Sequence, residues 1–529
     1  MNSFLNDEIT NRFIEHNISI FKKKHYNTGH IFLLEFNGWE GVQIANSYLV
    51  NSIPLIKNCK IVAFESYRIF QKTKSFLLQN IKWFFGSFFK IKNFGIYNSF
   101  GTDNFIFEKK NFKIQNQAKI ITNNFFSKTV KKNDLENFCI KNIWIGDLIY
   151  DSYLKKYNEP TINLKDKKFK EFFELCICNF FFWDNYFRLN NVRGVAVSHG
   201  VYTFAIPIRI AIKKNIPAYV CSDSKIVRIN KKICSFQKKT TGVEMQNIYF
   251  RKLFNKFSIE DKRIAHKKGK LFLKNLIAGK AQYFYLSKKI NRNNTSKFSF
   301  EKNNLPKIII FAHSFHDSPH IRGKNLFPDF YEWLNYLSLI APKTNYDWYI
   351  KAHPNYNEDY IINDFVKKNP FIKKINSSVK NLTLVNEGLK YALTTYGSCG
   401  AELPYLGVKV VNASINNPHV KYNFSISPKN IKSYKKTILN LKNVKVNFSK
   451  NELYEYHYMN QYYFTNNYLF NNMGNYHSKN NGRATMYTKK IFSEWIKNFS
   501  KEKHCTIIES INNFDINKEY SVSQKKSFN

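Results

Sequence analysis

The segment from residue 391 to residue 412 constrains the fold of this 529-residue chain more than any other. It begins with a short apolar run that predicts a buried strand, followed by a turn that contains Gly397 and Ser398. A short helix carrying Glu402 and a second apolar run then complete a strand–turn–helix–strand unit. Because such units build parallel sheets with helices on their faces, the sequence predicts an α/β fold.

A second motif, Lys351-Ala-His-Pro, comes shortly before this unit. Residues 347–352 predict another buried strand, and Pro354 favours an extended conformation for His353, just beyond the strand end. Taken alone, His353 is as readily a hydrogen-bonded histidine at the rim of the sheet as a ligand-binding one. In open α/β sheets, however, ligands bind outside the carboxyl ends of the strands, where amides that begin a helix can meet phosphate. Both motifs therefore predict one crevice.

The length of the chain predicts more than one domain. One series of strands and helices begins at residues 30–64, with a glycine-containing turn after its first strand, and another begins at residues 307–311. We therefore expect two Rossmann-like domains with parallel sheets flanked by helices, a C-terminal helix and a polar tail. The predicted divisions are 1–220 for the N-terminal domain, 221–306 for a basic helical connector, 307–499 for the C-terminal domain and 500–529 for a flexible polar tail.

The formal net charge of +44 would admit nucleic acid as a partner. The surplus is nearly all lysine, however, and no nucleic-acid-binding motif is found. Because arginine is favoured for reading base edges, nucleic acid is not expected. An anionic substrate or a surface of anionic lipid fits the charge better.

No segment is predicted to cross a membrane, because the most apolar stretch, 76–89, is interrupted by Lys82. The first 20 residues mix charged and apolar side chains, unlike a signal peptide. The eight cysteines lack metal-binding spacing and are expected to be free thiols in a reducing compartment. We therefore expect a cytoplasmic protein, with peripheral contact at the inner face of the cytoplasmic membrane as a further option.

The loop that follows the predicted strand 307–311 concentrates titratable side chains: three histidines, among them His313, then Asp317, Arg322 and Lys324. Zinc is one candidate ligand, but the loop contains a proline and no compact pair of histidines on a helix. Contact with phosphate or sugar is the favoured interpretation, and a solvated loop without a ligand is the main alternative.

Three polar residues in the first half of the chain also fall at or just after predicted strand ends: Glu35, Asp147 and His199. Each could act as an acid or base on a hydroxyl group of a second substrate. Asp147 could equally cap a helix that starts at Leu148. Glu35 lies in an apolar strand, where burying a carboxyl group is costly, which favours a functional role.

The two opening motifs resemble those of the bacterial glycosyltransferases of capsule and surface polysaccharide biosynthesis, including Kdo-transferase-like members. The matching positions are Lys351-x-His353-Pro354, Gly397-Ser398, Glu402 and, more loosely, Asp147 and Ser198-His199-Gly200. Such enzymes have the GT-B fold, in which two Rossmann-like domains face each other, and they need no metal; no cofactor is expected. The resemblance implies a nucleotide-sugar donor, such as a CMP-activated Kdo, on the C-terminal domain and a glycan or lipid-linked acceptor on the N-terminal one.

The resulting donor-site prediction comprises His313, Asp317, Arg322, Lys324, Lys351, His353, Gly397, Ser398 and Glu402, and the catalytic candidates are Glu35, Asp147 and His199. Pro404 departs from the pattern, because it removes an amide from the helix that carries Glu402. Polyol-phosphate transferases and sugar-nucleotide 2-epimerases share the architecture and remain alternatives. A non-enzymatic membrane-surface component of polysaccharide export is a third.

Overall fold

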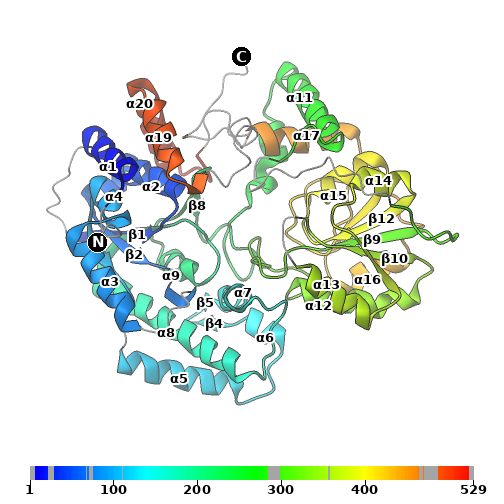
Figure 1. Cartoon of the computed structure of the whole chain (residues 1–529), viewed down its shortest axis with the longest axis horizontal. Coiled ribbons are helices and arrows are strands. Elements are labelled where there is room, and N and C mark those ends of the chain that lie inside the picture. Colours follow the sequence, from blue (N-terminus) through cyan, green and yellow to red (C-terminus); the bar gives the residue numbers. More distant parts are fainter. Residues whose placement is uncertain are drawn as a thin grey trace. The chain divides into compact units, whose positions relative to one another are not determined.

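A computed structural model divides the chain into two compact units (Figure 1). Unit 1 comprises Met1–Ser152, Asn163–Val243 and Asn466–Ser527, and unit 2 comprises Tyr153–Ile162, Glu244–Thr465 and Phe528–Asn529. The structure describes residues 6–21, 29–66, 68–70, 76–109, 111–283, 298–354, 358–463, 469 and 486–522.

Unit 1 is built on a six-stranded sheet with the order β3-β2-β1-β6-β7-β8, which is the strand order of a Rossmann fold. Neighbouring strands are parallel except β7 and β8, which are antiparallel. The central strand β1 is almost entirely apolar because both of its faces are covered. The strands are β1 (His30–Phe36), β2 (Lys60–Glu65), β3 (Thr102–Ile106), β6 (Asn191–Val197), β7 (Ala218–Cys221) and β8 (Ile226–Ile229), with a separate hairpin of β4 (Cys139–Ile140) and β5 (Ile143–Trp144).

Helices from both ends of the chain contribute to the core of unit 1. Phe13 of α1 stacks on Phe492 of α19 with ring centroids 4.0 Å apart, and α20 buries Ile507, Ile511 and Phe514 in the same core. The helices are α1 (Glu8–Ile20), α2 (Glu40–Ser52), α3 (Phe76–Phe89), α4 (Asn93–Ser99), α5 (Phe112–Phe126), α6 (Lys132–Glu136), α7 (Gly146–Tyr157), α8 (Lys167–Leu189), α9 (Ile206–Lys213), α19 (Lys490–Lys497) and α20 (Lys501–Ile516).

The prediction of a flexible tail from residue 500 is therefore wrong for residues 501–516, and residues 486–499 group with unit 1 instead of the predicted donor domain. The physical reason is a stripe of apolar residues spaced three to four positions apart in α20, which the polar composition of the segment conceals.

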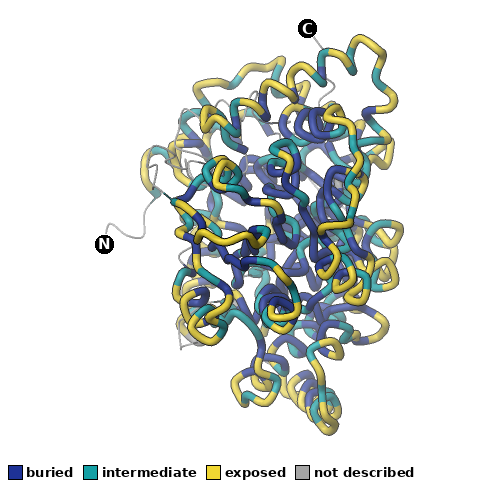
Figure 2. Tube along the Cα trace, turned by 90° about the vertical axis from the view of Figure 1, so that its right-hand side faces the viewer, coloured by how far each residue is buried: buried dark blue, intermediate teal, exposed yellow. Residues whose placement is uncertain are grey.

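Unit 2 contains a five-stranded sheet with the order β11-β10-β9-β12-β13, in which all neighbours are parallel. Alternate residues face opposite sides: Ile308 and Ile310 join the core beneath α12, α13 and α16, whereas Ile309 and Phe311 join the core beneath α14 and α15. Figure 2 shows buried residues along the inside of the fold and exposed ones on its outer turns. The strands are β9 (Lys307–Phe311), β10 (Asp347–Lys351), β11 (Ile372–Ile375), β12 (Leu389–Thr394) and β13 (Lys409–Asn412).

The helices of unit 2 confirm several local predictions. Asp329 caps α12, accepting a hydrogen bond from the amide of Glu332 at 2.7 Å, and α15 lies between β12 and β13 as predicted. The predicted α/β class, with parallel sheets flanked by helices in two Rossmann-like units, is thus confirmed. The helices are α10 (Phe250–Phe254), α11 (Ile259–Ile277), α12 (Phe330–Ile340), α13 (Asp359–Lys368), α14 (Asn381–Asn386), α15 (Cys399–Glu402), α16 (Ile431–Leu439) and α17 (Lys450–Tyr458).

Helix α11, in the predicted connector, packs closely on α17 at Gly269, where an added Cβ would lie 2.0 Å from the carbonyl oxygen of Tyr454. Replacing Gly269 by Ala should therefore force the helices apart and lower the free energy of unfolding by about 1–3 kcal/mol in chemical denaturation. Gly29→Ala is the control, since its methyl group would meet nothing within 4 Å. Equal stability of the two variants would contradict the close packing.

Candidate functional site

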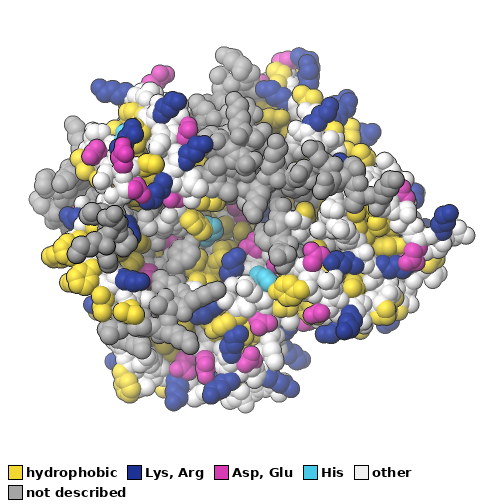
Figure 3. Space-filling model, in the orientation of Figure 1, with side chains coloured by type: hydrophobic (Ala, Val, Ile, Leu, Met, Phe, Trp, Pro, Cys, Tyr) yellow, Lys and Arg dark blue, Asp and Glu magenta, His cyan; other side chains and the backbone are white. Residues whose placement is uncertain are grey.

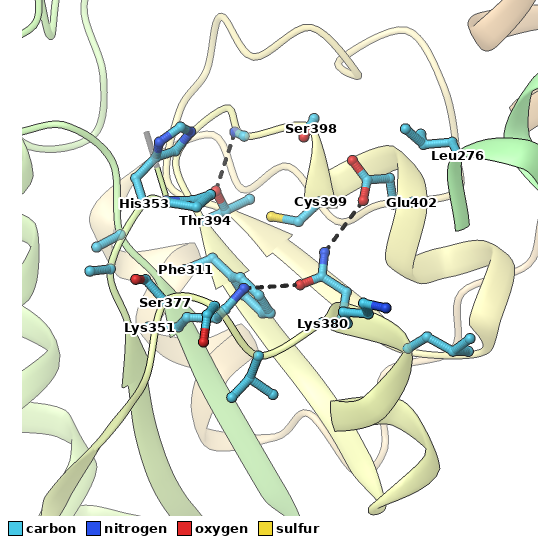
Figure 4. Close-up of a pocket in the computed structure, with 18 of the residues that line it drawn as sticks. Leu276, Phe311, Lys351, His353, Ser377, Lys380, Thr394, Ser398, Cys399 and Glu402 are labelled. Atoms are coloured by element: carbon cyan, nitrogen blue, oxygen red, sulfur yellow. Dashed lines mark hydrogen bonds between the residues drawn. The ribbon is translucent and has the colours of Figure 1, made fainter. Parts of the chain in front are cut away.

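A pocket with a volume of about 210 Å³ lies in unit 2 beyond the carboxyl ends of β9, β10 and β12 (Figure 4). The central strand β9 pairs with β10 on one side and with β12 on the other. From β9 the chain continues outward to β10 and β11 and then returns to β12 and β13 on the opposite side, so the strand order reverses at β9. Ligand sites of open α/β sheets occur at such positions. Of the nine predicted donor residues, six line the pocket: His313, Lys351, His353, Gly397, Ser398 and Glu402.

A polar chain crosses the pocket from Lys351 to Glu402, both labelled in Figure 4, through hydrogen bonds to Asn381. The Lys351 ammonium group donates to Asn381 Oδ1 at 3.4 Å, and Asn381 Nδ2 donates to Glu402 Oε2 at 3.3 Å. Lys351 is buried although it carries a charge. The pocket thus holds a cation and a carboxylate at its two ends, with an amide between them that can exchange partners.

The turn after β12 brings backbone amides to the pocket. The Gly397 amide donates to Thr394 Oγ1 at 3.2 Å, and a Cβ at Gly397 would lie only 2.8 Å from that oxygen, so glycine is required for this conformation. The amide of Ser398 donates no hydrogen bond within the part of the chain that the structure describes. This amide can therefore donate a hydrogen bond to a bound anion.

The helix after this turn is short. Helix α15 has four residues and passes into a 3-10 turn (Leu403–Leu406) that has Pro404 in its first positions, which confirms the expectation drawn from this proline. Glu402 nevertheless reaches the pocket. Burial raises the pKa of the Cys399 thiol, beside Glu402, to about 12, so this cysteine is not a nucleophile at neutral pH.

Two histidines on adjacent strand ends, His313 and His353, stand near one another with ring centroids 6.3 Å apart. Burial lowers the pKa of His313 to about 3 and that of His353 to about 4, with further lowering by nearby cations. Nε2 of His313 is buried and has no hydrogen-bond partner among the described residues. Both rings are therefore neutral at physiological pH and offer hydrogen bonds without charge.

The loop from residue 312 to residue 324 is organised by Glu358, which accepts hydrogen bonds from Ser314 Oγ at 2.7 Å and from the amide of Phe315 at 3.0 Å. His316 lies 3.1 Å from the same carboxylate. Burial opposes ionisation of Glu358, but these hydrogen bonds outweigh it and lower its pKa. Within the described ranges, no group of three or more His, Cys, Asp or Glu side chains is placed to hold a metal ion.

The three remaining donor candidates, Asp317, Arg322 and Lys324, do not line the pocket. Arg322 donates to the carbonyl oxygen of Glu244 at 2.6 Å, and its guanidinium lies 5.9 Å from the centre of the Tyr396 ring. Its positive charge also contributes to the lowered pKa of His313.

Two further histidines of unit 2, His419 and His457, are fully buried, and burial lowers their pKa values to about 3 and about 4. In the unfolded chain a histidine titrates near pH 6.5. Below this pH the two histidines are therefore protonated in the unfolded state but still neutral in the folded state. Stability is therefore complete above pH 6.5 and falls as the pH is lowered, by roughly 1 kcal/mol per histidine at pH 5.5. Denaturant titrations between pH 7.5 and about pH 5 would measure this loss.

His419→Phe provides the matched variant for this pH effect, since the ring lies among the aromatic side chains of Phe424 and Tyr456 at 5.6 and 5.1 Å. Below pH 6.5, unfolding of this variant should take up about one proton fewer than unfolding of the wild type, so its free energy of unfolding should fall less steeply as the pH is lowered. A pH dependence equally steep in both proteins would contradict the assignment.

In unit 1, two of the three catalytic candidates meet at the carboxyl ends of β1 and β6. The carboxylate of Glu35 accepts hydrogen bonds from the amide of Ser198 and from Ser66 Oγ, the latter at 2.5 Å. Ser198 Oγ lies 3.0 Å from His199 Nδ1, and the His199 ring packs edge-on against Trp39 at 4.8 Å. Burial raises the pKa of Glu35, and the hydrogen bonds from the two serines only partly offset this.

Asp147, the third candidate, is located elsewhere in unit 1. It lies in the first turn of α7 and is buried in an ion pair with Arg209, whose Nη2 is 2.6 Å from Asp147 Oδ2. The Arg209 guanidinium also lies 4.8 Å from the centre of the Trp144 ring. The structure thus gives Asp147 a structural contact, and its predicted catalytic role has no support from this geometry.

The sequence interpretation did not include Asn381, Thr394 or the end of α11. Thr394 lies at the end of the predicted strand that begins at residue 391, so its place at a strand end is the signal that could have found it. Asn381 is the first residue of α14, after β11, where no strand was predicted. Leu276, Ile277 and Tyr283 form an apolar wall of the pocket, although they belong to the predicted connector. Their contribution depends on long-range packing of α11 against α17, which no local pattern reveals.

No protein-family model and no curated protein matches the chain. Among solved structures, it is similar to KpsC of Thermosulfurimonas dismutans, a beta Kdo 2,4 transferase, with 12% identity and a TM-score of 0.33 over 50% of this chain and 79% of that one. It is also similar to the UDP-GlcNAc 2-epimerase of Neisseria meningitidis bound to UDP-GlcNAc, with 13% identity and a TM-score of 0.22 over 89% of this chain and 100% of that one. With TM-scores this low, the function has to be argued from the pocket itself.

Proposed function

We propose that this protein is a glycosyltransferase of GT-B architecture that takes its sugar from a nucleotide-activated donor bound in the pocket of unit 2. The observation that carries the proposal is that buried Lys351 and the turn at Gly397 and Ser398 line the same pocket as Glu402, with Asn381 hydrogen-bonded to both Lys351 and Glu402. A nucleotide needs both kinds of contact, because its phosphates are anionic and its ribose carries two vicinal hydroxyl groups.

In the proposed complex, Lys351 and the Ser398 amide bind the phosphate of the donor, and His353 donates a further hydrogen bond to it. Glu402 accepts hydrogen bonds from the ribose hydroxyls. The base packs on the apolar wall that Leu276 and Ile277 provide. Stabilising the departing phosphate with a buried cation would supply most of the acceleration, since charge develops there in the transition state. The cationic end of the pocket also suits a CMP-activated acidic sugar such as Kdo.

For the acceptor, a glycan or lipid-linked glycan, we assign the base to His199. His199 is partly exposed, whereas Glu35 is only 1% exposed and already accepts two hydrogen bonds. Glu35 is then a positioning residue that holds Ser198, and through it the imidazole of His199.

His199→Ala should reduce transfer but leave nucleotide affinity unchanged, because the nucleotide site is built from other residues.

Product analysis tests the proposed reaction. The protein would be incubated with CMP-, UDP- and GDP-activated sugars and with oligosaccharide acceptors, and the products separated by mass spectrometry. A new glycoside together with free nucleotide is the expected result. An epimerised sugar nucleotide formed without acceptor would instead show a 2-epimerase, and a phosphodiester a polyol-phosphate transferase. A thermal-shift panel of CMP, UDP, GDP and CDP first identifies the nucleotide, because a ligand that binds only the folded protein raises its melting temperature.

A further inference from the structure

Helix α3 presents a continuous apolar surface to solvent. Figure 3 shows hydrophobic side chains gathered at the left edge of the molecule, where Figure 1 places this helix. Six of its large hydrophobic side chains are between 41% and 68% exposed, and adjacent phenylalanines contact each other, with Phe88 and Phe89 at 5.0 Å. The six are Leu78, Ile81, Phe84, Phe85, Phe88 and Phe89.

This exposure does not come from a poorly attached helix. Trp83 lies on the opposite side of α3, is buried, and packs against Phe36 and Phe94 at 4.9 and 5.0 Å. Gly86, one turn later, lets α3 approach α4 so closely that an added Cβ would lie 2.4 Å from the Phe94 ring. The helix is thus anchored to unit 1 through its inner face, while its outer face is apolar, the reverse of an ordinary surface helix.

The charged residues on the helix and directly after it are all basic, although the exposed Asp103 of β3 lies within electrostatic range of Lys90. Lys82 on the helix and Lys90 and Lys92 just after it are exposed, and the sequence from Ser66 to Thr102 contains no Asp or Glu. Basic residues beside exposed aromatic and aliphatic side chains are the composition of helices that lie in the interface of a membrane with anionic lipids. With 14 residues the helix is too short to span a hydrocarbon core of about 30 Å.

We propose that α3 is a membrane-docking helix, which lies parallel to an anionic bilayer with its phenylalanines inserted among the lipid headgroups. A second copy of the chain fits less well, because two such helices facing each other would bring their lysines together, and neither helix carries an Asp or Glu. The docking surface goes beyond the proposed sugar transfer and does not depend on it, although it would bring the enzyme to a lipid-linked acceptor.

The test is co-sedimentation of the full chain with vesicles of phosphatidylcholine containing about 30% phosphatidylglycerol, compared with vesicles of phosphatidylcholine alone. The wild type should bind the anionic vesicles, and Phe84→Ser with Phe88→Ser should weaken this binding at least about tenfold. Leu271→Ser with Leu339→Ser is the matched control, since both leucines are exposed in unit 2. Lys82→Gln with Lys90→Gln should lower binding to the anionic vesicles and leave the apolar contact intact.

Thermal unfolding midpoints close to that of the wild type would show that the variants are folded, as expected for exposed side chains. The proposal is overturned if the wild type does not sediment with anionic vesicles or if the Phe84/Phe88 variant binds as well as the control. A wild-type dimer in solution that the Phe84/Phe88 variant dissociates, without vesicle binding, would identify a second copy as the occupant and also overturn it.

Discussion

Replacing Asp147 by Ala is expected to lower the free energy of unfolding by about 3–5 kcal/mol. The substitution leaves the Arg209 guanidinium buried, with 6% of its side chain exposed, and without the carboxylate that lies 2.6 Å away in the wild type. A buried charge that loses its counter-charge keeps its full desolvation cost. Chemical denaturation followed by circular dichroism would measure the loss.

The matched control removes both charges. Asp147→Leu with Arg209→Met should restore stability to within about 1 kcal/mol of the wild type, because hydrophobic side chains of similar size commonly replace a buried ion pair without loss. The same double variant should retain sugar transfer if Asp147 is structural. If Asp147→Ala unfolds like the wild type but cannot transfer sugar, then Asp147 acts in catalysis and the structural interpretation is wrong.

Replacing Lys351 by Met should weaken nucleotide binding by about 10- to 100-fold, as expected when a charged partner of a phosphate is lost. Stability should change by less than about 1 kcal/mol, because the methionine side chain is similar in length and can pack over the Phe311 ring, whose centre lies 5.8 Å from the Lys351 ammonium group in the wild type. Isothermal titration with the nucleotide identified in the thermal-shift panel would measure the affinity.

Lys390→Met is the control for this substitution, since Lys390 is an exposed lysine on β12 that does not line the pocket. It should bind the nucleotide as tightly as the wild type. An equal loss of affinity in both variants would mean that Lys351 acts through the overall positive charge of the protein and not through a contact in the pocket.

Local patterns predicted those parts of the fold that local interactions determine. The apolar run at 347–352 forms β10, and the two apolar runs within 391–412 belong to β12 and β13, because a few neighbouring residues determine an alternation of buried strand and helix. The cap at Asp329 and the short helix before Pro404 follow from a single side chain each. The same local patterns predicted His353 just beyond a strand and Ser398 and Glu402 in the turn and short helix that follow a strand, and all three line the pocket.

Contacts between residues far apart in the chain could not be predicted from local sequence patterns. Asp147 and Arg209 are 62 positions apart, and the residues around Asp147 do not indicate that a buried arginine contacts it. The lining contributed by α11 and the packing of α20 into unit 1 likewise depend on which distant surface each helix covers. Tertiary packing determines these contacts. The polar composition of residues 501–516 and the basic charge of residues 221–306 therefore led to wrong expectations for α20 and gave no sign that α11 lines the pocket.

Hydrogen–deuterium exchange with and without the bound nucleotide tests the central claim most directly, because it reports where on the chain the ligand binds. Addition of the nucleotide should slow exchange in peptides that cover residues 311–314, 351–354, 377–382 and 394–402, which together line the pocket. The effect should disappear in Lys351→Met at the same nucleotide concentration. Unchanged exchange in all four segments, or protection confined to unit 1, would contradict a nucleotide site at the carboxyl ends of β9, β10 and β12.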